Sequence, residues 1–180
     1  MSRLPLAEAE TLPAFLKEMH DGARTDDWST RHVARAFAAH PDLLERYLSF
    51  YYPFHSNDGV DGALEPRLKE LVRLRIATLN GCKTCKAARL DPDHVTEDEA
   101  ARGVDMVAEG GSFSPREKAA VRLAELMAEN HHAFDDDTMR DLRAQFSDRE
   151  ILELMMMAGQ YIGFGRMLAA LQLETVSCPI

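Results

Sequence analysis

Residues 70–89 of this chain read E-L-V-R-L-R-I-A-T-L-N-G-C-K-T-C-K-A-A-R. The apolar residues before position 80 recur at helical spacing, and Glu70 lies at the margin of this apolar stripe. Asn80-Gly81 ends the helix, because glycine takes the left-handed conformation after a helix without strain. The stretch therefore predicts two consecutive helices, with a Cys-x-x-Cys pair at the start of the second.

The expected helix start at Cys82 favours a thiolate. Unpaired backbone N–H groups and the helix dipole stabilise an anion there, and Lys83 and Lys86 are close in sequence. Cys82 is therefore expected to be the more exposed thiol, with the lower pKa. Cys85 lies nearly one turn on and is placed to resolve a mixed disulfide from the inside.

Two other interpretations of the cysteine pair remain open. A structural zinc site needs four ligands, and no second paired motif supplies them. The spare candidates are His94, His131, His132 and Cys178. Alternatively, both thiols are buried and inert, since free cysteine often serves as a small core residue. The spacing favours a redox dithiol, and we expect no metal and no other cofactor.

Composition is that of a single domain spanning residues 1–180. With 46% hydrophobic and 28% charged residues, the chain can bury a full core without a disulfide staple. Residues 1–13 lack a signal pattern, and apolar runs such as residues 154–159 are too short to span a bilayer. Two of the three cysteines share one motif, which fits a reducing compartment. We expect a cytoplasmic protein without a membrane segment.

The balance of charge is acidic. The 30 acidic and 21 basic residues give a net charge of −9, which disfavours nucleic acid and anionic membranes as partners. Against this background residues 67–89 are locally basic. Most of these cations, including Arg67, Lys69, Arg73 and Arg75, are interpreted as a solvated helix face.

Helical periodicity recurs from end to end without alternating runs, so the predicted fold class is all-α. Capping sequences begin several helices, at Thr96, Ser114 and Ser147. The predicted helices cover Leu12–His20, Ser29–Ala39, Pro41–Tyr52, Glu65–Leu79, Cys82–Leu90, Glu97–Glu109, Pro115–His131, Asp136–Gln145 and Asp148–Leu173. The apolar, methionine-rich last helix has more hydrophobic surface than one stripe can use, which favours contact with a second subunit.

An internal repeat emerges when residues 64–74 are placed over residues 113–123. The two segments share P-R-x-K-x-x-V-R-L. In this alignment Ala119 replaces Glu70, and neither cysteine has a cysteine counterpart. The pattern predicts N-terminal helices in residues 1–55, a redox-active repeat in residues 64–109 and a structural repeat in residues 113–173.

The run L-x-P-R-L-K-E-L-V-R-L-R-I-A-x-L-N-G-C-x-x-C at residues 64–85 resembles the carboxymuconolactone decarboxylase superfamily, and within it the AhpD-like alkylhydroperoxidase branch. The resemblance implies an all-helical, AhpD-like multi-helix bundle that assembles as a homo-oligomer, a trimer or hexamer. It also implies that Cys82 and Cys85 reduce peroxides or a partner's disulfide and are regenerated by a thiol reductant. In that pattern a Glu twelve residues before the first Cys, here Glu70, and a His four residues after the second form a proton relay.

The chain departs from the pattern at the relay histidine, where it has Arg89. A guanidinium stays protonated and cannot shuttle a proton, although it can stabilise a thiolate or pair with Glu70. Four histidines elsewhere in the chain are interpreted as surface or packing residues: His55, His94, His131 and His132. Four alternatives follow: a disulfide oxidoreductase with little peroxidase activity, a peroxidase that uses Glu70 and water, a redox-sensing or scaffold oligomer without catalysis, and a carboxymuconolactone decarboxylase-like enzyme.

Overall fold

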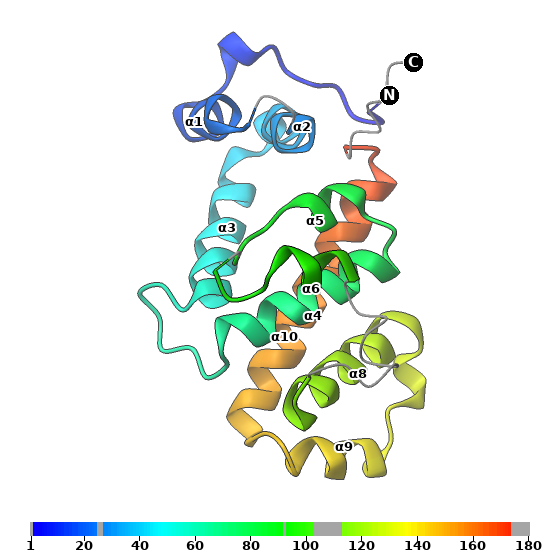
Figure 1. The fold of residues 1–180 in the computed structure, drawn as a ribbon. Helices are drawn as coiled ribbons and strands as arrows, with labels where there is room; N and C mark the ends of the chain where they lie inside the picture. The colour runs from blue at the N-terminus through cyan, green and yellow to red at the C-terminus, as the bar shows by residue number, and fades with distance from the viewer. Residues whose placement is uncertain (1, 25–26, 92, 103–112, 174–180) are drawn as a thin grey trace.

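The computed structural model describes residues 2–24, 27–91, 93–102 and 113–173. Within these ranges the chain forms helices and loops and no strand, as the periodicity predicts (Figure 1). The α-helices are α1 (Ala14–Gly22), α2 (Trp28–Ala36), α3 (Pro41–Ser56), α4 (Pro66–Leu79), α5 (Lys83–Ala87), α6 (Glu97–Arg102), α8 (Pro115–Glu129), α9 (Asp136–Arg143) and α10 (Asp148–Ala170). Positions 103–109 of the predicted helix 97–109, and Cys178, lie outside the described residues.

Helix α10 connects two apolar cores. Its first half packs with α4 and α8, where Leu154 and Met157 are almost fully buried. Its second half packs with α1, α2 and α3 through Leu168. Figure 1 shows α1 and α2 at one end of the molecule and α9 at the other, with α10 running between them. The dithiol helix α5 lies where these two parts meet.

The capping signals are confirmed. Ser114 and Ser147 each begin a helix with a complete capping box, in which the Ser side chain and a Glu three residues later satisfy each other's backbone N–H groups. At α6, Thr96 and Glu99 exchange the same bonds. After α4, Gly81 has a φ of 65°, and the Cys82 N–H bonds to the carbonyl of Ala77. This geometry ends α4 at the predicted residue.

Two arginines that the repeat alignment pairs, Arg67 and Arg116, make equivalent contacts. Arg67 donates to the carbonyl of His94 at 2.6 Å and pairs with Glu99 at 2.8 Å. Its counterpart Arg116 donates to the carbonyl of Gln145 at 2.6 Å and pairs with Glu150 at 2.5 Å. Arg67 therefore joins α4 to the start of α6, and Arg116 joins α8 to the start of α10.

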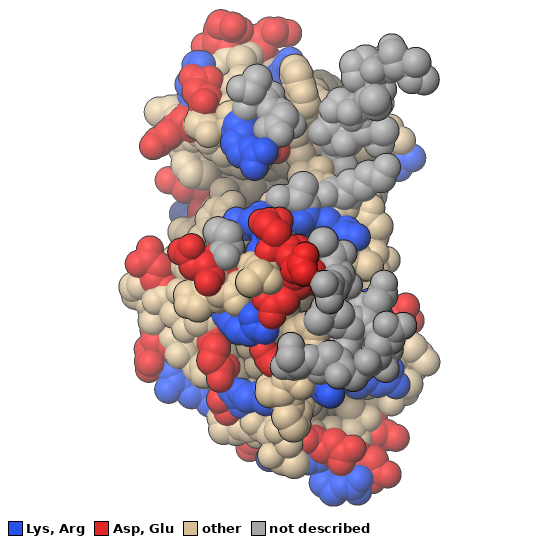
Figure 2. All heavy atoms as spheres, in the orientation of Figure 1, with Lys and Arg blue, Asp and Glu red and all other residues tan. Residues whose placement is uncertain are grey.

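Surface charges of both signs are interspersed on the face shown in Figure 2. Many belong to ion pairs such as Arg143 with Asp148. Among the described residues, none of the helices combines the length and apolar character needed to cross a membrane.

Helix α3 continues one turn beyond its predicted end at Tyr52. Pro53 removes one backbone donor, but the helix runs on to Ser56 and is closed by Asn57, whose N–H bonds to the Pro53 carbonyl. Phe54 packs against the core of α4, α8 and α10, and His55 is 1% exposed. These tertiary contacts outweigh the local cost of proline. They place His55 in the interior rather than in a loop.

Helix α5 is shorter than predicted and ends at Ala87 rather than at residue 90. Arg73 of α4 donates hydrogen bonds to the carbonyls of Cys85 and Ala88, at 2.6 and 2.5 Å. Those carbonyls therefore have partners without a further helical turn. Ala88 is extended, and Arg89 lies beyond the helix.

The prediction of a solvated basic face was wrong for two residues. Lys69 has no exposed surface, and its ammonium group contacts the carbonyl of Phe54 and the side chains of Asn57 and Glu153. Arg73 is 4% exposed. Helix α4 is central, so even its basic residues need internal partners.

Most of the apolar surface of α10 is used inside the subunit. The two large apolar side chains of α10 that stay exposed are Leu152, at 71%, and Met156, at 56%. They are four residues apart and therefore share one face of the helix.

Candidate active site

The dithiol lies at the start of α5, as predicted. Cys82 is the N-cap residue, and its sulfur accepts a hydrogen bond of 3.0 Å from the backbone N–H of Cys85. The Cα atoms are 5.2 Å apart, and the two sulfurs are joined as a disulfide. The turn between α4 and α5 therefore positions both sulfurs through local backbone geometry.

The exposure of the two cysteines is the reverse of the prediction. Cys82 has no exposed surface, whereas Cys85 is half-buried and lines a cavity. The sequence argument considered only the helix end. In the folded chain the turn after α4 turns the N-cap side chain inward, so the second cysteine faces the cavity.

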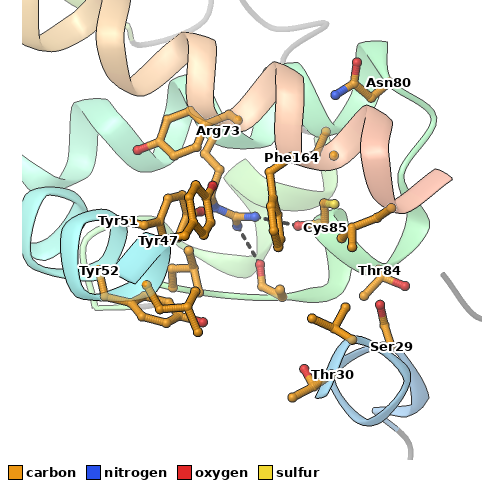
Figure 3. A pocket seen from close by; sticks show the side chains of 18 residues that line it. Ser29, Thr30, Tyr47, Tyr51, Tyr52, Arg73, Asn80, Thr84, Cys85 and Phe164 are labelled. Carbon is orange, nitrogen blue, oxygen red and sulfur yellow. Dashed lines mark hydrogen bonds between the residues drawn. The ribbon is translucent and has the colours of Figure 1, made fainter. Parts of the chain in front are cut away.

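The cavity has a volume of about 130 Å³ and lies between α2, α3, α4, α5 and α10. In Figure 3 the tyrosines of α3 lie on one side and Cys85 on the other, while Ser29 and Thr30 of α2 approach from below. A water occupies about 30 Å³ in the liquid, so the cavity is large enough for a small organic molecule. The aromatic lining consists of Tyr47, Tyr51, Tyr52, Tyr161 and Phe164.

Glu70 lies fully buried behind this cavity. Its carboxylate accepts two hydrogen bonds from Arg73, at 2.6 and 2.8 Å, and one from the Leu90 N–H at 3.3 Å. Burial alone would raise the pKa of Glu70, but the hydrogen bonds from Arg73 and the close approach of His55 outweigh it and lower the pKa to about 2. Glu70 is therefore ionised at neutral pH.

Arg73 connects Glu70 to the dithiol helix. One edge of its guanidinium binds the carboxylate, and Nη1 donates to the Cys85 carbonyl. Burial acts to lower the pKa of Arg73, but the bonds to Glu70 raise it, so the group stays protonated. The buried charge of Glu70 is therefore compensated within one turn of α4.

His55 joins the site from α3. Its Nε2 lies 3.3 Å from the carboxylate of Glu70, and its Nδ1 lies 2.8 Å from the hydroxyl of Tyr161 on α10. All three side chains are buried. Tyr161 also lines the cavity that contains Cys85. A chain of polar groups therefore runs from the cavity wall to the carboxylate.

Arg89 lies apart from the cavity. Its guanidinium pairs with Glu97 and donates to the carbonyl of Val95, and its Nε is 3.9 Å from Glu70. The expected position four residues after Cys85 on one helix face is not realised, because α5 ends first. Arg89 therefore contacts the site only through Glu70.

The described residues hold no group of three or more His, Cys, Asp or Glu side chains that could bind a metal ion. His94 pairs with Asp91, and the rings of His131 and His132 contact each other at a tilt, with centroids 4.0 Å apart. Cys178, the fourth zinc candidate, is outside the described residues.

Sequence reasoning missed three residues of this site. Arg73 had a local signal, because it follows Glu70 by three positions and such pairs meet on a helix. His55 had no distinguishing neighbour and was placed after the end of its helix. Tyr161 is one apolar-stripe residue among many in α10, and its contact with His55 spans 106 positions.

Comparison with known proteins supports the assignment of the fold. Residues 41–126 match the model of the carboxymuconolactone decarboxylase family. No match to a curated protein reaches significance.

Three solved structures share the fold. A protein from Ralstonia eutropha JMP134, described as an alkylhydroperoxidase AhpD core and an uncharacterized peroxidase-related protein, has 17% identity and a TM-score of 0.72, covering 96% of this chain and 90% of that one. An uncharacterized peroxidase-related protein from Silicibacter sp. TM1040 has 18% identity and a TM-score of 0.73, covering 95% and 90%. A protein of unknown function from Agrobacterium tumefaciens has 24% identity and a TM-score of 0.61, covering 80% and 95%.

The matched segment runs from α3 into α8 and includes Glu70, Cys82 and Cys85. The similarity of the solved structures extends over the rest of the chain. Residues 41–126 are therefore similar to the carboxymuconolactone decarboxylase family, and the chain has the fold of the AhpD-like solved structures.

Proposed function

We propose that this protein is a thiol-dependent oxidoreductase that reduces small peroxides or partner disulfides at Cys85. The observation that carries the proposal is the placement of the cysteine pair: Cys85 lines an aromatic cavity, and Cys82 lies behind it within bonding distance. Peroxide chemistry needs an attacking sulfur that the substrate can reach and a second thiol close enough to form a disulfide with it. The accessibility of Cys85 and the proximity of buried Cys82 support these roles, which are exchanged relative to the sequence-based prediction.

The reaction with a hydroperoxide would proceed in two steps. The Cys85 thiolate attacks the terminal peroxide oxygen, the O–O bond breaks, and the leaving alkoxide takes up a proton to become an alcohol. The Cys82 thiol then attacks the sulfenic acid of Cys85, water leaves with the thiol proton, and the disulfide forms. The thiol pair loses two electrons and the peroxide gains them. A disulfide substrate would react by exchange at the same sulfur.

Regeneration requires an external thiol reductant. Two reductant thiols would reduce the Cys82–Cys85 disulfide through a mixed disulfide at the accessible Cys85. Such a cycle operates in a reducing compartment, which fits a cytoplasmic location.

In this proposal Glu70 and Arg73 hold the site rather than exchange protons. Glu70 is ionised well below neutral pH and is surrounded by donors, so it is a weak base. Arg73 anchors the carbonyl of Cys85 and thereby fixes the sulfur at the cavity wall. Arg89 would contribute indirectly, through its charge near Glu70.

The test is turnover of a hydroperoxide and of an aromatic disulfide with dithiothreitol as reductant. Wild-type protein should turn over at least one of the two substrates. Cys85→Ser should be inactive toward both. Cys82→Ser should react once, leaving a sulfenic acid or mixed disulfide on Cys85 that mass spectrometry detects. Cys178→Ser, which removes the third thiol, is the matched control and should keep wild-type turnover.

Other outcomes would identify the alternatives. A wild-type protein that oxidises once and then changes its assembly without turnover would be a redox sensor. Turnover that persists in the Cys82→Ser, Cys85→Ser double variant would contradict dithiol chemistry. It would favour the alternative of a carboxymuconolactone decarboxylase-like enzyme.

A further inference from the structure

We infer that Tyr161 and His55 form the proton path of this cavity and replace the imidazole that the AhpD-like pattern has at position 89. The inference rests on the proposed function, because it assigns the proton that the leaving group takes up. It concerns residues of α3 and α10 that lie far in sequence from the Cys-x-x-Cys motif.

The geometry forms a continuous path. The Tyr161 hydroxyl lies 2.8 Å from His55 Nδ1, and His55 Nε2 lies 3.3 Å from Glu70. Tyr161 and Cys85 line the same cavity, whereas His55 and Glu70 lie behind the wall. The path therefore starts at a side chain that substrate can touch and ends at a buried anion.

The buried anion selects one tautomer of His55. Glu70 is ionised and accepts hydrogen bonds only, so Nε2 carries a proton and faces the carboxylate. The other ring nitrogen, Nδ1, is then the acceptor for the Tyr161 hydroxyl. When Tyr161 passes its proton to Nδ1, an imidazolium forms beside the carboxylate, which stabilises it. This is the arrangement by which a carboxylate orients a histidine and supports its charge.

The other charged groups around His55 do not shuttle protons. Burial and the bonds to Glu70 leave Arg73 protonated, and Arg89 also carries a guanidinium, which stays protonated near neutral pH. Tyr51 stacks its ring on that of His55 from the same helix, whereas the hydroxyl of Tyr161 lies within hydrogen-bond distance of Nδ1. The imidazole of His55 has one nitrogen that can donate and one that can accept, so it is the group in this cluster that can pass a proton on.

The proton balance of the proposed reaction follows. Tyr161 accepts the thiol proton of Cys85 while its own proton moves to His55, which leaves a thiolate and an imidazolium. The thiolate attacks the peroxide and the O–O bond breaks. The imidazolium returns its proton through Tyr161 to the leaving alkoxide. Tyr161 touches the reacting atoms in this scheme, and His55 and Glu70 act through it.

Peroxides whose leaving groups differ in basicity test the proton path through Tyr161 and His55. An alkyl hydroperoxide releases an alkoxide, a strong base that needs a proton, whereas a peracid releases a weakly basic carboxylate that does not. Tyr161→Phe removes only the hydroxyl. It should slow sulfenic acid formation with tert-butyl hydroperoxide roughly 10²-fold, the low end for a positioned general acid, and with peracetic acid much less. His55→Gln keeps a polar group but cannot carry the proton, so it should show the same selective loss.

Tyr47→Phe is the matched control, because it removes a hydroxyl from the same cavity, one that has no hydrogen-bond partner among the described residues. It should leave the ratio of the two peroxide rates at the wild-type value. Equal slowing of both peroxides in Tyr161→Phe, or no slowing, would overturn the proton path and leave the dithiol function standing. A wild-type protein inert toward both peroxides and the aromatic disulfide would overturn the proposed function and this path together.

Discussion

Arg73 donates a 2.6 Å hydrogen bond from Nη1 to the backbone carbonyl oxygen of Cys85. The same guanidinium binds both carboxylate oxygens of Glu70. One buried cation therefore ties the acidic residue of α4 to the helix that carries the dithiol. Because α5 has only five residues, its position depends on this tertiary contact more than on its own helical hydrogen bonds.

Replacement of Arg73 by methionine should destabilise the protein strongly. The change removes both Arg73 hydrogen bonds from the buried Glu70 carboxylate and the Arg73 donors from the carbonyls of Cys85 and Ala88. Breaking a buried pair costs about 3–5 kcal/mol, which urea unfolding measures. Arg143→Met, on an exposed ion pair with Asp148, is the control and should cost less than about 1 kcal/mol. Equal effects of the two changes would contradict a structural role for Arg73.

The buried carboxylate predicts a pH dependence of stability. Burial opposes ionisation of Glu70, but its donors lower the pKa from 4.5 to about 2. A lowered pKa stabilises the fold at pH values above the unfolded-state pKa, and this contribution is lost as the pH falls from about 4.5 toward 2. Urea unfolding should therefore show a steeper loss of stability below about pH 5 in wild type than in Glu70→Gln. Glu129→Gln, at an exposed position of α8, should keep the wild-type profile.

The burial difference predicts the order of alkylation in the reduced protein. Cys85 should react with iodoacetamide at least about tenfold faster than Cys82, because modification of a fully buried thiol requires local opening. Peptide mass spectrometry over time distinguishes the two sites. Faster modification of Cys82 would contradict this prediction and would agree with the order of reactivity expected from the helix start alone.

Gly165 lets α10 approach the dithiol turn closely. A Cβ at this position would lie 2.9 Å from the amide nitrogen of Asn80 and 3.9 Å from the sulfur of Cys85. Gly165→Ala should displace Asn80, cost about 1 kcal/mol and lower turnover at Cys85. Gly159→Ala, in the same helix with nothing within 4 Å, should instead stabilise the protein by about 0.5–1 kcal/mol. Thermal unfolding and turnover of both variants compare the two positions.

The exposed pair on α10 predicts self-association. Leu152 and Met156 form an exposed apolar patch on one face of the helix, and we expect a second copy of the chain to cover this patch. Wild type should scatter light as an oligomer at micromolar concentration, and Leu152→Lys should shift it toward the monomer. Leu43→Lys, at an exposed apolar position of α3, is the control. A monomeric wild type would contradict the prediction.

Local signals account for what the sequence predicted well. These signals are the capping boxes, the Asn80-Gly81 stop and the apolar periodicity. Each involves residues within one or two turns of each other, so a short segment of sequence is enough to determine the local structure. The positions of Cys82, Cys85 and Glu70 along consecutive helices followed from the same signals. The alignment of residues 64–74 with 113–123 pairs Arg67 with Arg116, and these two arginines make equivalent contacts.

The tertiary structure decided which of these groups can act. The packing of α3, α4 and α10 determines three features of the site: the accessibility of Cys85, the burial of Arg73 and the approach of His55 to Glu70 and Tyr161. The contacts involved join residues up to 106 positions apart. The sequence by itself determined an all-α chain with a dithiol at a helix start. Only the packing of distant helices determined which sulfur faces the cavity and which imidazole stands behind it, because burial is set by the whole core rather than by neighbours in the chain.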